Sequence, residues 1–79
     1  MNELKLAEYF TDAKEDDDIE ISQWFKKPGE TFTADEPVVE VLIGKAETEV
    51  CLGKDGKLEE IICDEGEIVT INDVIGKIS

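Results

Sequence analysis

Short runs rich in valine and isoleucine alternate with polar residues along most of this chain. The runs cover residues 19–25, 38–43, 47–51, 58–63, 68–71 and 74–78. β-Branched residues in runs of this length favour strands. Glycine turns separate several of the runs, with KPGE at 27–30, KDGK at 54–57 and DEGE at 64–67. Proline-glycine favours a type II turn and aspartate-glycine a type I′ hairpin, so the pattern predicts an all-β domain.

The first eighteen residues are less regular. Leu4 and Leu6 alternate as in an edge strand, whereas Leu6, Tyr9 and Phe10 have the spacing of one helical face. Four consecutive acids at residues 15–18 destabilise the C-terminal end of any helix there. We therefore predict a short strand followed by an exposed acidic loop, with a helical turn between them as the alternative.

The chain contains an internal repeat. Laying Gly29 on Gly66, an offset of 37 residues, brings the apolar positions of two segments into step. The aligned pairs are Ile21 with Leu58, Trp24 with Ile61, Phe25 with Ile62, Phe32 with Val69, Val38 with Ile75, and Val41 with Ile78. Two similar β units that each lack a complete core bury their apolar faces together. The repeat predicts one domain over residues 1–79, a sandwich or flattened barrel with approximate two-fold symmetry, in which Trp24 and Phe32 are core residues.

The segment EVLIGKAETEV, residues 40–50, joins the two units and has the pattern of a hairpin that reverses at Gly44 and Lys45. A tight primed turn needs positive φ, which Gly44 adopts freely and Lys45 only at a cost. The Lys45 amine is then expected to project into solvent at one extremity of the domain.

Composition narrows the function. The chain has no histidine, no arginine and two serines, so the common general bases, phosphate clamps and nucleophiles are largely missing and an enzyme acting alone is not expected. A net charge of −13 repels nucleic acid and anionic membranes and favours a soluble monomer with basic protein partners. Cys51 and Cys63 are too far apart for a C-x-x-C pair, so no metal site is predicted. Without an apolar run of signal-peptide or membrane-spanning length, the cytoplasm is the predicted location.

Two longer segments resemble a known family. WFKKPGETFTADEPVVEVLIGKAETEV and GKLEEIICDEGEIVTINDVIGKI are similar to the lipoyl domains of 2-oxo acid dehydrogenase complexes, part of the biotinyl/lipoyl-carrier family, from about Ile19 to the end of the chain. The resemblance implies two four-stranded antiparallel sheets and a lipoyl group, from lipoic acid, in amide linkage on Lys45. It also implies a swinging-arm carrier that moves acyl groups and electrons without being a catalyst itself, in a protein such as a dihydrolipoamide acyltransferase.

The same resemblance implies a set of partners. These are a lipoate ligase or lipoyl transferase, a thiamin-dependent 2-oxo acid decarboxylase, an acyltransferase core and a dihydrolipoamide dehydrogenase. The acidic residues 15–18 lie near the modified lysine in this family, and we predict that they help to choose a basic decarboxylase surface. An unmodified binding or adaptor domain of the same fold, with Lys45 incidental, is the competing interpretation. A biotin carrier is a lesser one, because biotin carriers flank their lysine with methionines and the sole methionine here is Met1.

Recognition of Lys45 is expected to involve its neighbours Leu42, Ile43, Gly44 and Ala46. Gly44 replaces the aspartate usual in the family, and Leu42 and Ile43 replace residues that are commonly polar. One prediction is that Ile43 tucks under the hairpin while Leu42 packs against the N-terminal segment, at Tyr9 or Phe10. The other is that Leu42 and Ile43 together form an apolar platform for the lipoyl ring or for the decarboxylase.

Overall fold

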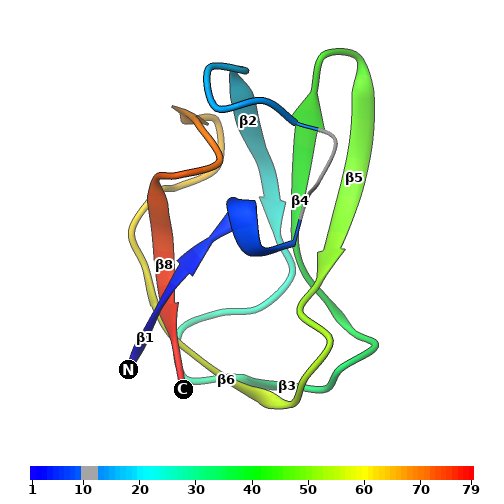
Figure 1. Ribbon diagram of the computed structural model, residues 1–79. Coiled ribbons are helices and arrows are strands. Elements are labelled where there is room, and N and C mark those ends of the chain that lie inside the picture. The colour runs from blue at the N-terminus through cyan, green and yellow to red at the C-terminus, as the bar shows by residue number, and fades with distance from the viewer. Residues whose placement is uncertain (10–12) are drawn as a thin grey trace.

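Two four-stranded sheets face each other across one apolar core in the computed structural model, which describes residues 1–9 and 13–79. The elements are β1 (Asn2–Lys5), the 3-10 helix η1 (Leu6–Glu8), β2 (Ile19–Trp24), β3 (Thr31–Phe32), β4 (Pro37–Ile43), β5 (Ala46–Cys51), β6 (Gly56–Ile61), β7 (Ile68–Val69) and β8 (Val74–Ile78). One sheet has the order β1-β8-β6-β3 and the other β5-β4-β2-β7, and every pairing is antiparallel. The predicted architecture is therefore confirmed (Figure 1).

The N-terminal segment combines both predicted alternatives. β1 pairs with β8, and η1 follows it at once. Leu4 and Leu6 are both fully buried, and the Ala7 amide donates a hydrogen bond of 2.9 Å to the Ile71 carbonyl. Residues 14–16 and 18 are exposed, as predicted for an acidic loop. The prediction for Phe10 lies outside the described residues.

The internal repeat is confirmed by the hydrogen bonds. The Gly29 amide donates to the Leu58 carbonyl at 2.7 Å, and 37 residues later the Gly66 amide donates to the Ile21 carbonyl, also at 2.7 Å. β2 and β6 begin and end at equivalent positions, as do β3 and β7. The bulge that interrupts the β2–β4 ladder recurs at the same place between β6 and β8. The two halves are thus related residue by residue, and each gives its two-residue strand to the sheet of the other.

The core is made of the inward-facing residues of both sheets. Its buried members are Leu4, Leu6, Ile19, Ile21, Phe32, Val38, Val39, Val41, Val50, Leu52, Leu58, Val69, Ile71, Ile75 and Ile78. Phe32 is 2% exposed, as predicted for a core residue. Trp24 is only half-buried at the edge of the core, where its indole Nε1 donates to the Cys63 carbonyl at 2.9 Å.

The Pro28–Gly29 turn has the predicted type II form, the turn at Gly66 shares that form, and the turn predicted at Gly56 does not occur. Gly29 and Gly66 have φ of +95° and +91°, and in each turn the next amide bonds back across it, as in type II turns. The Asp55–Gly56 pair does not form a type I′ turn, because positive φ occurs at Gly53 (+71°) and Gly56 starts β6. A Cβ at residue 56 would lie 2.8 Å from the Phe32 ring, so this glycine makes room for a core residue.

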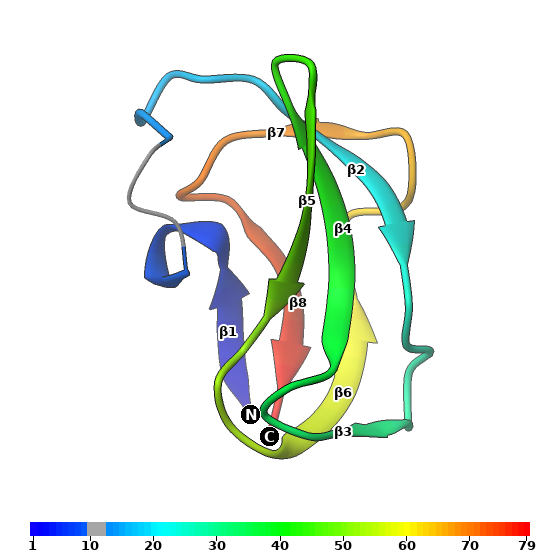
Figure 2. The same cartoon turned by 90° about the vertical axis from the view of Figure 1, so that its right-hand side faces the viewer.

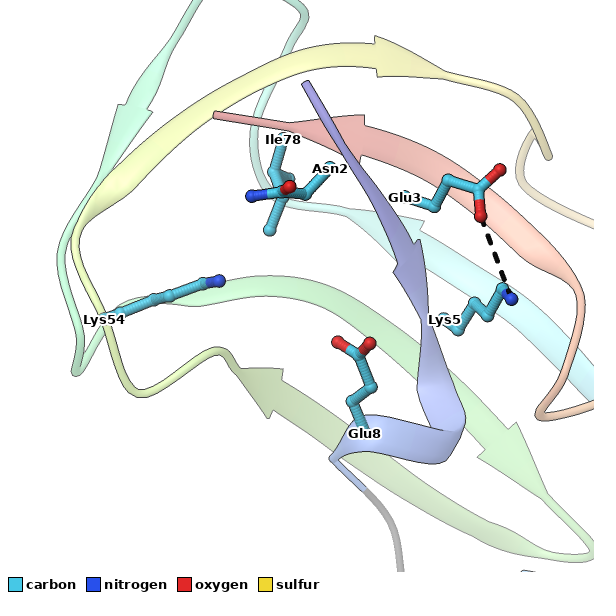
Figure 3. Close-up of a pocket in the computed structure, with 6 residues that line it drawn as sticks. All are labelled: Asn2, Glu3, Lys5, Glu8, Lys54 and Ile78. Atoms are coloured by element: carbon cyan, nitrogen blue, oxygen red, sulfur yellow. Dashed lines mark ion pairs between the residues drawn. The ribbon is translucent and has the colours of Figure 1, made fainter.

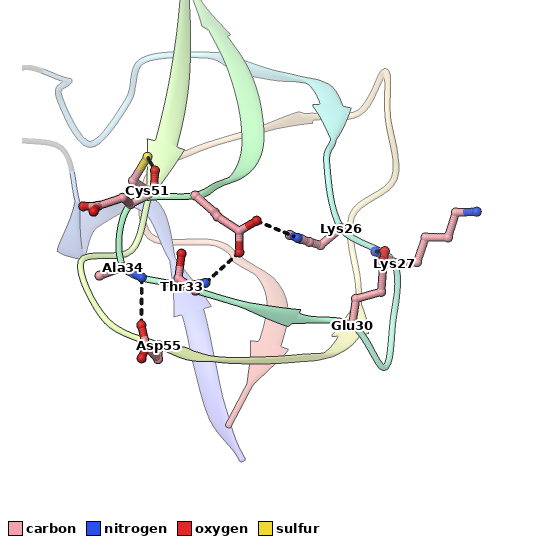
Figure 4. A network of polar contacts seen from close by, with 9 residues as sticks. Lys26, Lys27, Glu30, Thr33, Ala34, Cys51 and Asp55 are labelled. Carbon is pink, nitrogen blue, oxygen red and sulfur yellow. Dashed lines mark hydrogen bonds and ion pairs between the residues drawn. The ribbon is translucent and has the colours of Figure 1, made fainter.

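Side chains close the loops around β3. The Glu36 carboxylate accepts a hydrogen bond of 2.9 Å from the Thr33 amide, and it forms an ion pair of 3.2 Å with Lys26 Nζ (Figure 4). The Ala34 amide donates to Asp55 at 3.0 Å, tying the segment before β4 to the segment before β6. The backbone N–H of Thr33, with help from Lys26, lowers the pKa of the Glu36 carboxyl below its ordinary value. These bonds fix the end of the molecule that carries the chain termini.

Candidate functional site

Gly44 and Lys45 form the turn between β4 and β5. Ile43 pairs with Ala46, which leaves only two residues to reverse the chain. Gly44 has φ of +62°, and positive φ is confined to glycines among the described residues. A positive φ at the first central position alone is the type II′ arrangement. The predicted backbone cost at Lys45 is therefore wrong, because Gly44 alone adopts the positive φ that the turn requires.

The Lys45 side chain is exposed on a stiff support. β4 and β5 remain paired from the tip down to Pro37 and Cys51, and Val41 beneath the tip is fully buried. In the part of the chain that the structure describes, Lys45 forms no ion pair, unlike Lys26. The amine is therefore presented to solvent by a hairpin that the core holds in place.

The hairpin tip and the chain termini lie at opposite ends of the molecule. In both views the tip is at the top and the termini are at the bottom (Figure 1, Figure 2). Segment 14–18 approaches the tip end, and Ile19, which follows it, pairs with Ile43. The acidic loop and Lys45 therefore share one end, as predicted.

Leu42 and Ile43 point to opposite faces of their sheet. Ile43 packs against the core and pairs with buried Ile19, so the prediction that it tucks under the hairpin is confirmed. Leu42 pairs with Glu20 and Glu47 and is half-buried on the outer face. The predicted platform is wrong, because neighbours in a strand alternate in direction. The predicted contact of Leu42 with Tyr9 is also wrong, and its alternative, a contact with Phe10, lies outside the described residues.

The outer face beside the hairpin is acidic. Glu47 and Glu49 are exposed on β5, and Glu49 pairs with Glu40, which accepts a hydrogen bond of 3.2 Å from Ser22 Oγ. Ile68 on β7 belongs to the same sheet, and 58% of its surface is exposed. The strand pattern alone did not indicate that Ile68 is a surface residue, because an isoleucine in a strand favours burial. The signal lay in the repeat, which aligns it with a threonine.

A polar cavity lies away from the hairpin, beside β1 and the end of β8. Its lining consists of Asn2, Glu3, Lys5, Glu8, Lys54 and Ile78 (Figure 3). Lys5 and Glu3 are 3.8 Å apart, with the Lys5 side chain partly exposed and that of Glu3 largely exposed, so this is a weak surface pair. Ile78 is the sole apolar residue in this lining and none of the charged residues is buried, whereas ligand pockets are lined mainly by apolar side chains.

Neither cysteine forms a disulfide in the described structure. Cys51 is exposed, and Cys63 is half-buried, where burial and the nearby acids Glu67, Asp73 and Asp64 raise its thiol pKa. Across residues 1–9 and 13–79, no group of three or more histidine, cysteine or acidic residues is placed to hold a metal. Over the same residues, no helix has the length and apolar character needed to cross a membrane.

The family model Biotin_lipoyl, described as "Biotin-requiring enzyme", matches residues 9–78. The chain belongs to this family. Membership of the Biotin_lipoyl family confirms the resemblance found in the sequence and covers the Lys45 hairpin.

Relatives of this Biotin_lipoyl domain are components of dehydrogenase complexes. It is 41% identical over 59 residues to the dihydrolipoyllysine-residue succinyltransferase component of the 2-oxoglutarate dehydrogenase complex from Pseudomonas aeruginosa, matching 75% of this chain and 14% of that protein. It is 40% identical over 58 residues to the dihydrolipoyllysine-residue acetyltransferase component of the pyruvate dehydrogenase complex from Corynebacterium glutamicum, matching 73% of this chain and 9% of that protein. The chain thus spans a small fraction of the length of these relatives.

A solved structure has the same fold. It is the lipoyl domain of the 2-oxoglutarate dehydrogenase complex from Azotobacter vinelandii, determined in solution. The TM-score is 0.77 at 29% identity, covering 100% of this chain and 96% of that one. The present chain is therefore a Biotin_lipoyl domain of the lipoyl type, and its membership of this family makes it a carrier domain.

Proposed function

We propose that this domain carries a lipoyl group on Lys45 and moves acyl groups and electrons between enzymes of a 2-oxo acid dehydrogenase complex. The observation that supports this most directly is the exposed Lys45 at the tip of a rigid two-residue turn. A modifying enzyme needs an accessible amine in a fixed setting. The exposed neighbours Gly44 and Ala46 are small, so neither side chain blocks approach to it.

The division of labour follows from the cofactor. The dithiolane of a lipoyl group, when attached, supplies the acyl-accepting and redox chemistry, and the protein supplies position. Lys45 contributes a long flexible stem to the arm. Tethering raises the effective concentration of the arm at each enzyme, so transfer does not depend on tight binding. The enzymes concerned are a thiamin-dependent decarboxylase, an acyltransferase and a dihydrolipoamide dehydrogenase.

Lipoyl is favoured over biotin as the attached group. The named relatives at about 40% identity are dihydrolipoyllysine-residue transferases, and the solved structure is a lipoyl domain. Lys45 also lacks the flanking methionines of biotin carriers, since residues 44 and 46 are glycine and alanine. Gly44 keeps the turn but removes the family's aspartate, so a ligase must recognise the hairpin by its shape.

Intact-mass measurement after coexpression with a lipoate ligase tests the proposal. We expect one lipoyl group on the wild type and none on Lys45→Arg, which keeps the charge and the turn. The matched control is Lys54→Arg, because Lys54 is also an exposed loop lysine and its replacement is expected to leave modification complete. Unmodified wild type would overturn the proposal in favour of an adaptor role, and a biotin adduct would assign the domain to the biotin carriers.

A further inference from the structure

The two halves of this fold provide an internal comparison of surfaces. Because they share strand bounds, register and bulges, equivalent positions face the same structural demands. A side chain that differs in character between equivalent exposed positions is therefore not required by the fold. Only one of the two sheets carries the Lys45 hairpin, so surface features confined to that sheet are candidates for recognition.

The sheet with Lys45 has a row of side chains across its outer face. Ile68 pairs with Glu20, Glu20 pairs with Leu42, and Leu42 pairs with Glu47, so four residues on β7, β2, β4 and β5 lie side by side. We call these four residues the outer row. Adjacent strands are about 4.8 Å apart, which places Ile68 and Leu42 roughly 10 Å from each other with Glu20 between them.

Three of the four outer-row positions have an equivalent on the other sheet, and all three equivalents are polar. Thr31 occupies the position of Ile68 and pairs with Lys57, the equivalent of Glu20. Ser79 occupies the position of Leu42, and its amide and carbonyl both bond to Lys57 at 3.0 and 2.9 Å. The same backbone therefore forms with threonine, lysine and serine at these positions. The apolar side chains of Ile68 and Leu42 and the acid at Glu20 are therefore not needed to build the sheet.

Ile68 differs in this respect from the other exposed isoleucine. Ile62 is 41% exposed, but its equivalent is Phe25, so that position is apolar in both halves. Ile68 is 58% exposed and faces solvent from an edge strand of only two residues. An exposed isoleucine on an edge strand promotes unwanted association with other chains, and exposed apolar residues of this kind often mark an interaction site.

We infer that the outer row is the docking surface for the thiamin-dependent decarboxylase that acylates the lipoyl arm. The decarboxylase would present an apolar side chain flanked by lysine or arginine. This inference rests on the proposed function. Leu42 is three residues from Lys45 in the same hairpin, so a partner seated on the row has the arm within reach. Glu20 and Glu47 and the net charge of −13 complement a basic partner and steer its approach. The apolar pair supplies the buried contact that such docking needs.

Acylation kinetics test the row. The lipoylated domain is the substrate, and the probes are the thiamin-dependent decarboxylases of a bacterial 2-oxoglutarate complex and a bacterial pyruvate complex. With the enzyme that acylates the wild type, we expect Leu42→Thr/Ile68→Thr to lower kcat/KM about tenfold, chiefly by raising KM. Ile62→Thr, which removes an exposed isoleucine outside the row, is expected to leave kcat/KM unchanged.

The salt dependence of kcat/KM and the folding of each variant distinguish a docking role of the outer row from a purely structural role. Glu20→Gln/Glu47→Gln is expected to weaken the dependence of kcat/KM on salt, which a purely structural role would not alter. All variants are first confirmed as fully lipoylated by mass. Undiminished acylation of folded Leu42→Thr/Ile68→Thr, or an equal loss in Ile62→Thr, would overturn the docking surface alone. If neither enzyme acylates the lipoylated wild type, the proposed function falls and the outer row with it.

Discussion

Exchanging one core pair between the two halves tests how strictly the repeat governs packing. In one half Gly56 pairs with Phe32, and at the equivalent place in the other half Ile19 pairs with Val69. The two pairs contain the same number of side-chain carbon atoms, and the three non-glycine side chains are at most 5% exposed. The phenyl ring therefore occupies space that an isoleucine occupies in the other half. The double variant Gly56→Ile/Phe32→Val copies that arrangement.

The expected energies follow from the local contacts. Phe32→Val removes four buried carbons, which costs about 3 kcal/mol at about 0.8 kcal/mol per methylene. Gly56→Ile places a Cβ 2.8 Å from the Phe32 ring and 2.6 Å from the Ser79 carbonyl, an overpacking cost of about 3 kcal/mol. The smaller valine relieves the ring contact and the isoleucine fills the cavity. The backbone contact with Ser79 remains, so we expect the double variant to lose about 3 kcal/mol instead of about 6.

Urea denaturation followed by Trp24 fluorescence measures these differences, because Trp24 is the sole tryptophan. A domain of this size has about 4–12 kcal/mol of stability, so a loss of about 6 kcal/mol is a large share of it and exceeds the lower end of the range. If Gly56→Ile does not fold alone, recovery of a cooperative transition in the double variant still demonstrates the coupling. A double variant whose loss equals the sum of the single losses would refute the exchange of space between the halves.

Three further predictions concern ionisation and the turn. Since Glu36 has a lowered pKa, its ion pair and hydrogen bond add stability above the ordinary pKa of 4.5 and lose it as the pH falls through the lowered value; the Tm gap between wild type and Glu36→Gln should close there, and a gap that persists in acid would contradict this. Iodoacetamide should alkylate exposed Cys51 first, with Cys63 slower and strongly accelerated by alkaline pH, because burial raises its pKa. Equal rates at neutral pH would argue against that difference. Gly44→Ala should cost about 1 kcal/mol in urea denaturation because of the positive φ, and an unchanged midpoint would disprove the strain.

Much of the fold could be predicted because the sequence states it twice. The offset of 37 aligned the buried positions, and the structure repeats strand bounds and bulges at that offset. β3 was missed because two residues, Thr31–Phe32, are too short to reveal an alternation. The turn predicted at Gly56 was wrong for a non-local reason, since that glycine accommodates Phe32 from another strand. Contacts between distant segments leave no local signature in the sequence.

The candidate site was predictable in position but not in detail. A glycine and a lysine between two alternating runs were enough to place Lys45 at a hairpin tip. The direction of Leu42 was not assigned correctly, because a half-buried leucine next to a turn is compatible with either face until the register is known. The exposure of Ile68 could not be predicted for the same reason, since it depends on which elements cover the strand. The register, and not the composition, separates the core isoleucines from Ile68 in the outer row.

The pairing of β1 with β8 brings both chain termini to one end of the domain. Asn2 pairs with Ile78, so both ends of the chain leave from one pole, and the molecule is 29 Å along its longest axis. The turn between β4 and β5, which contains Lys45, lies at the opposite end of the molecule (Figure 2). Any protein fused to either terminus is therefore attached at the end of the domain opposite Lys45. A surface, tag or larger subunit attached there holds the domain with its arm facing outward, and either terminus serves equally well as the point of attachment.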